Sequence, residues 1–147
     1  MDITKTKVPE DVTKHLEFIQ SVVARMANHS FLLKGWTITL TAAIFGLAAK
    51  GTNPTFVLIA FFPAAAFWGL DAYYLRRERL FRKLYDDVRR SKKDGVQTVE
   101  PFSMDTSRYE ADVPSVWRTM WCGAIVWLHG IVLLAIVLVF GILQQTH

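Results

Sequence analysis

Three long apolar runs stand out along the chain, at residues 31–49, 54–75 and 117–143. Each run holds a single charged residue, and that residue lies close to one end of the run. A helix needs about 20 residues to cross the roughly 30 Å hydrocarbon core of a bilayer, so each run is long enough. The pattern predicts an all-α protein of one domain, residues 1–147, with three transmembrane helices.

Two amphipathic stretches flank these runs, at residues 9–30 and at the start of residues 76–116. Apolar residues in both recur every three to four positions, and in the first stretch they form a short heptad seam. We predict that each stretch continues into the neighbouring run as one rod, the first with a bend at Gly35, and that their apolar faces pack on each other. The alternatives for 9–30 are self-association between copies and a position flat on lipid. The seam residues are Val12, Leu16, Ile19, Val23 and Met26, followed by Leu80 or Phe81, Leu84 and Val88 in the second stretch.

Basic residues are distributed unevenly around the runs. Of the 17 Lys and Arg residues, five precede residue 35, one is Lys50 and eleven lie between residues 76 and 118. Since basic flanks stay on the cytoplasmic side, we predict a cytoplasmic N-terminus and a cytoplasmic helix and loop at 76–116. The turn near Lys50 and the C-terminal tail then lie outside, in the periplasm or extracellular space.

The composition narrows the possible functions. Apolar residues make up 52% of the 147 residues, and the net charge is +4. Cys122 is the only cysteine, which excludes an intrachain disulfide scaffold. The four histidines are scattered, and the sequence has neither zinc-ligand spacing nor a phosphate-binding glycine loop. We therefore expect no enzyme, no metal and no cofactor.

Polar residues inside the apolar runs are candidates for pore-lining or gating. His129 lies 12 residues into the third run, about 18 Å from its start, and an ionisable group at that depth is a functional hypothesis by default. The alternative is a neutral imidazole bonded to a neighbouring helix or to Trp127. Thr37 and Thr41 share one face of the first run, where they bond back to carbonyls of their own helix, pack against a partner helix or face an aqueous path. Phe45 is the candidate bulky gate on the same run.

Charged residues near the ends of the runs are candidates for an ion pair. Lys34, Asp71 and Arg118 are expected at similar depth near the cytoplasmic surface. Pairing among them would fix the register of the helices and remove the cost of a lone charge.

A basic cluster after the second run allows two interpretations. Such a cluster meets anionic lipid of the inner leaflet, or it binds a phosphorylated ligand, a nucleic acid or a protein partner. The residues proposed for a ligand or partner are Arg79, Arg82, Lys83, Arg89 and Arg90.

Three segments carry a resemblance, namely residues 28–36 (NHSFLLKGW), 67–85 (FWGLDAYYLRRERLFRKLY) and 102–106 (FSMDT). They resemble a family of small bacterial three-pass membrane proteins, similar to the channel-forming transmembrane effectors of anti-phage systems. The resemblance implies a homo-oligomeric pore in the bacterial inner membrane that stays shut until infection. It also implies a cytosolic nucleotidyltransferase or other sensor as partner, or the nucleotide or oligonucleotide product of that enzyme. Because the chain has no nucleotide-binding module, such a ligand would have to bind at the basic cytoplasmic helices.

Two functions follow from these observations. The first is a gated ion channel, which needs several copies, for example a tetramer, because three helices cannot enclose a water path. The second is a passive membrane anchor or adaptor that recruits a cytosolic enzyme.

Overall fold

A computed structural model describes residues 10–50, 54–94 and 99–145. Within these ranges the protein is all-α and has no strand. The predicted helix start at residue 9 and the end of the C-terminal tail lie outside the described residues. The elements are α1 (Glu10–Ala48), η1 (Pro54–Ala60), α2 (Phe61–Asp94), η2 (Ser107–Tyr109), α3 (Val116–Met120) and α4 (Gly123–Gln145).

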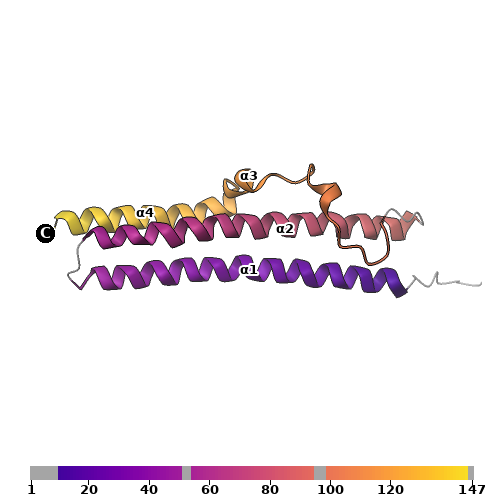
Figure 1. The fold of residues 1–147 in the computed structure, drawn as a ribbon, viewed down its shortest axis with the longest axis horizontal. Helices are drawn as coiled ribbons and strands as arrows, with labels where there is room; N and C mark the ends of the chain where they lie inside the picture. Colours follow the sequence, from indigo (N-terminus) through magenta and orange to yellow (C-terminus); the bar gives the residue numbers. More distant parts are fainter. Residues whose placement is uncertain (1–9, 51–53, 95–98, 146–147) are drawn as a thin grey trace, which may run out of the picture.

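The molecule is an elongated bundle of three long helices (Figure 1). Helices α1 and α2 run antiparallel along its length, with 39 and 34 residues, or about 58 Å and about 51 Å at 1.5 Å per residue. Helix α4 lies along the half of α2 next to η1, and the segment leading to α3 lies along the other half (Figure 1). We call the half of the bundle that contains η1 and α4 the apolar half, and the half that contains the segment leading to α3 the charged half.

The apolar half contains three helical stretches that are long and apolar enough to cross a membrane. They belong to α1, to η1 with α2, and to α4, which confirms the three predicted transmembrane helices. Helix α1 is unbroken across Gly35, so its amphipathic and apolar parts form one rod as predicted. Pro63 does not interrupt α2 because it is the third residue, where a missing backbone N–H costs no helical bond.

The charged half has a core of large aliphatic side chains. Ile19 of α1 packs with Leu80, Leu84 and Val88 of α2, and Tyr109 closes the core from the loop before α3. The two amphipathic stretches therefore pack against each other, as predicted. Their apolar faces are covered within one chain.

The apolar half is packed through smaller side chains. Ala48, Ala60 and Ala64 are buried there together with Ile136 of α4. Large apolar side chains point outward instead, and Phe62 is 81% exposed. Small residues at helix contacts and bulky residues on the outside are typical of helices that associate in lipid.

The third apolar run is broken near its start. Residues Val116–Met120 form the short helix α3, and a turn at Trp121 and Cys122 separates it from α4. The indole Nε1–H of Trp68 donates to the carbonyl oxygen of Met120 at 3.1 Å, which satisfies a backbone group that the break leaves free. The long helix therefore starts at Gly123, six residues later than the run in the sequence.

Candidate functional site

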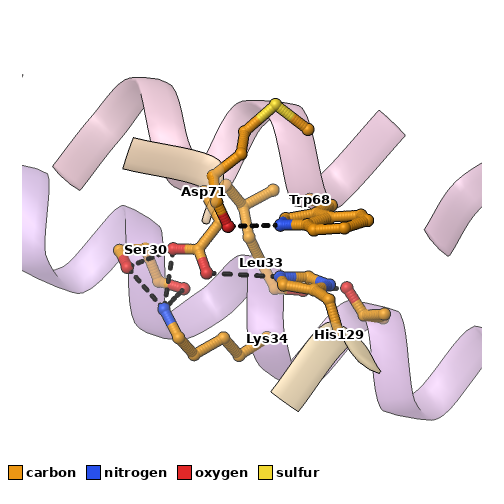
Figure 2. A network of polar contacts seen from close by, with 8 residues as sticks. Ser30, Leu33, Lys34, Trp68, Asp71 and His129 are labelled. Atoms are coloured by element: carbon orange, nitrogen blue, oxygen red, sulfur yellow. Dashed lines mark hydrogen bonds and ion pairs between the residues drawn. The ribbon is translucent and has the colours of Figure 1, made fainter. Parts of the chain in front are cut away.

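A buried carboxylate joins the three long helices at one level. Asp71 of α2 is fully buried. Its Oδ1 lies 2.7 Å from Lys34 Nζ and accepts a hydrogen bond from the Ser30 hydroxyl, both on α1. Its Oδ2 lies 3.3 Å from Nε2 of His129 on α4. Figure 2 shows these side chains converging on Asp71 from both neighbouring helices.

Ser30 and Lys34 meet because they are four residues apart on one helix face. Lys34 Nζ donates to Ser30 Oγ at 2.7 Å, and the same hydroxyl donates onward to Asp71. The Lys34 side chain is 25% exposed, so part of it lies at the surface of the bundle. Lysine and carboxylate thus form a neutral pair in which Ser30 serves as donor and acceptor at once.

His129 completes the cluster from the third helix. Its ring is 1% exposed, and a neutral imidazole that donates from Nε2 to Asp71 keeps the cluster's net charge at zero. In that tautomer Nδ1 is an acceptor, and no described residue donates to it. The cluster therefore contains one unused buried polar atom.

The Trp68 side chain packs beside the cluster. Its ring stacks on His129 with centroids 6.1 Å apart and an interplanar angle of 14°. The Trp121 ring also meets the indole edge-on, with ring centroids 5.5 Å apart. Because the Trp68 indole is also hydrogen-bonded to Met120, it fixes the His129 ring in place (Figure 2).

The predicted set Lys34, Asp71 and Arg118 is only partly brought together. Lys34 and Asp71 form the ion pair, whereas Arg118 lies exposed on α3. The break after α3 is the physical reason, because it turns α3 away from the line of α4. His129 takes the third position, and as the seventh residue of α4 it lies about 9 Å from that helix's start. It is therefore shallower than the 18 Å expected from an unbroken run.

The pore candidates of α1 continue the polar face of Ser30 and Lys34. Thr37 is fully buried and its hydroxyl donates to the Leu33 carbonyl at 2.8 Å. Thr41, one turn further, is 5% exposed, and its hydroxyl oxygen has no partner among the described residues. Thr41 and the half-buried Phe45 line an apolar groove of about 630 Å³ between α1 and α4.

The basic candidates on α2 do not converge on one pocket. Arg79 donates to Cys122 Sγ at 3.2 Å, and Arg82 pairs with Glu78 at 2.7 Å. Arg89 lies 3.8 Å from Asp86. Lys83 and Arg90 are exposed on the helix surface. Taken together they form a basic surface along α2.

Two members of the site, Ser30 and Trp68, were missed by sequence reasoning. Each lies one helical turn before a charged residue of an apolar run, Ser30 before Lys34 and Trp68 before Asp71. Side chains three or four residues apart share a helix face, so this spacing was the available signal.

Comparison of the chain with protein-family models, curated proteins and solved structures finds no match. Within the described residues, no group of His, Cys, Asp and Glu has an arrangement that holds a metal ion. The functional argument therefore depends on the fold and the Asp71 cluster.

Proposed function

We propose that the protein is a homo-oligomeric ion channel of the bacterial inner membrane, opened from the cytoplasmic side. The observation that carries the proposal is the buried Asp71 cluster, which ties all three apolar helices together where the apolar half meets the charged half. Ionisable groups buried in transmembrane helices are costly and mark ion pathways, relays and sensors. The basic flanks of the helices support a cytoplasmic charged half.

The continuous rods supply a route for gating. Helices α1 and α2 carry Lys34 and Asp71, and both helices extend unbroken from the charged half into the apolar half. A rotation or shift of one rod against the other in the cytoplasm changes the distance between these two side chains. The ion pair thus acts as a latch for the closed state, and a ligand or partner that favours another arrangement releases it.

Conduction requires several copies, for which a tetramer is one candidate. The interior of a single chain is filled, since Thr37, Asp71 and Ile136 are fully buried. The groove between α1 and α4 exposes an apolar surface where another copy can pack. In such an assembly α1 borders the central path, with Phe45 as the bulky gate.

The opening signal in this proposal comes from the cytosol. The exposed basic surface of α2 fits a phosphorylated ligand or an acidic partner. With the resemblance to anti-phage effectors, the signal is a nucleotidyltransferase or another sensor, or its nucleotide or oligonucleotide product. Opening would then depolarise the membrane of an infected cell.

A passive anchor or adaptor is the second candidate. It is favoured by the charged half, which has its own core and displays Lys83 and Arg90 to solvent. In an anchor, the Asp71 cluster only fixes helix register. The two functions differ in one respect, because an anchor conducts no ions in any state.

The deciding experiment removes the latch and measures conductance. Purified wild type and Asp71→Asn are compared in planar bilayers, and membrane potential is followed with a dye in expressing cells. Asp71→Asn should raise open probability without any signal, because Lys34 loses its charged partner. Thr41→Trp in that background should reduce the current, whereas Leu138→Trp, on the exposed face of α4, should leave it unchanged. If Asp71→Asn is inserted and folded yet conducts nothing, the channel is refuted and the anchor is supported.

A further inference from the structure

A second pocket lies between α1 and α2, on the charged side of the Asp71 cluster. It has a volume of about 440 Å³, and its polar lining consists of Arg25 of α1 with Tyr73, Tyr74 and Arg77 of α2. Phe81 and Met104 contribute an apolar part. None of these residues belongs to the basic surface discussed above or to the latch.

The two arginines have no acidic partner in the described part of the chain. Several other basic residues of α1 and α2 pair with an acidic residue, such as Lys34 with Asp71 and Arg82 with Glu78. Arg77 instead lies over the Phe81 ring, with its guanidinium carbon 5.8 Å from the ring centroid. Two like charges that line one pocket repel each other, and a bound anion removes that repulsion.

The pocket lies where the apolar surface of the bundle ends. Arg77 lies six residues, or about 9 Å, beyond Asp71 towards the charged half. Tyr73, which lines the pocket, is 45% exposed. The apolar outer surface begins on α1 with Phe31 and Trp36, which are 73% and 57% exposed. Tyrosines at this level are typical of the headgroup region of a bilayer.

We propose that this pocket binds a phosphate group, supplied by an anionic phospholipid of the leaflet next to the charged half. The guanidinium groups offer paired N–H donors that match phosphate oxygens, and the tyrosine hydroxyls add further donors. Met26, on the side of the pocket nearer the apolar half, contacts the glycerol and the first acyl carbons. The level of the pocket favours a lipid over a soluble phosphate, since the acyl chains can then follow the exposed apolar half.

The test measures lipid affinity in the detergent-solubilised full chain by native mass spectrometry. Phosphatidylglycerol is titrated in parallel with phosphatidylcholine. The double variant Arg25→Gln with Arg77→Gln should bind phosphatidylglycerol about tenfold more weakly than wild type. Replacing both arginines by lysine should also weaken binding, because lysine keeps the charge and loses the forked geometry.

A charge-matched control separates this pocket from general attraction to lipid. The variant Lys14→Gln with Arg118→Gln loses the same two charges from exposed positions and should bind like wild type. If both double glutamine variants lost the same affinity for phosphatidylglycerol, the proposal would be overturned. Inorganic phosphate at constant ionic strength forms the second arm: if it displaces the lipid at matched concentration, the ligand is a soluble phosphate and the lipid assignment is wrong. Neither result depends on whether the protein conducts ions.

Discussion

The two halves of the bundle arrange their side chains in opposite ways. In the charged half, Leu80 and Leu84 are fully buried, while charged side chains such as Arg82 face outward. In the apolar half, Phe62 is 81% exposed, and Asp71 and His129 are buried. Since α1 and α2 run through both halves, the same two helices must suit two different solvents. The reversal is what a boundary between water and hydrocarbon demands of a continuous helix.

The halves also differ in what holds their helices together. Burial of large aliphatic side chains stabilises the charged half, because water drives those side chains inward. That driving force is missing between helices in lipid, so close packing of small residues and polar contacts must replace it. The Asp71 cluster therefore contributes more to helix association than an ion pair exposed to water would.

The largest expected effect comes from replacing Asp71, in the polar interior of the apolar half. Asp71→Leu leaves the Lys34 ammonium without its counter-charge and should cost about 3–5 kcal/mol of unfolding free energy. Adding Lys34→Met removes the stranded charge and should recover most of that loss. Thermal unfolding in lipid–detergent micelles measures both variants. Equal stabilities for the single and the double variant would contradict a coupled pair.

A second pair of variants compares leucines in the two halves. Leu84→Ala creates a cavity in the core of the charged half and should cost about 2–5 kcal/mol. Leu138→Ala removes a side chain that is 56% exposed on α4, so its cost should stay below about 0.5 kcal/mol. The same unfolding assay tests the comparison. Similar costs would mean that the apolar half buries Leu138 against something that one chain does not contain.

A smaller effect concerns Tyr109, in the core of the charged half. Its hydroxyl donates to Asp87 Oδ2 at 2.7 Å, and burial together with that carboxylate raises the pKa of Tyr109 to about 12. The unfolded value is about 10, so the neutral phenol stabilises the fold below pH 10, and this contribution is lost as pH rises from 10 to 12. Phenolate absorbance should show a step near pH 12 that Tyr109→Phe removes. A titration unchanged by the substitution would contradict the contact.

The course of the long helices could be predicted because apolar periodicity extends over many residues. The seam from Val12 to Met26 and the repeat from Leu80 to Val88 indicated which faces meet. Lys34 and Asp71 could be matched because each lies at the charged end of an apolar run. These arguments need only distance along a helix.

The position of His129 could not be predicted in the same way. Its depth was counted from Trp117, and the sequence gives no strong breaker between α3 and α4 other than Gly123. At the break the Trp68 indole donates to the Met120 carbonyl, a contact between residues far apart in sequence. The loop before α3 shows the same limit: Phe102 adopts a positive φ of 60°, and the adjacent Ser103 carbonyl lies 2.9 Å from His15 Nε2 of α1.

Single-cysteine labelling tests most directly whether one half lies in the bilayer and the other in the cytosol. In a Cys122→Ser background, Arg89→Cys, Phe62→Cys and Gln144→Cys are each treated with a membrane-impermeant maleimide on spheroplasts and on inside-out vesicles. The account predicts that Gln144→Cys reacts only on spheroplasts, Arg89→Cys only on inside-out vesicles, and Phe62→Cys on neither before detergent is added. Labelling of positions 89 and 144 from the same side, or ready labelling of position 62, would contradict it.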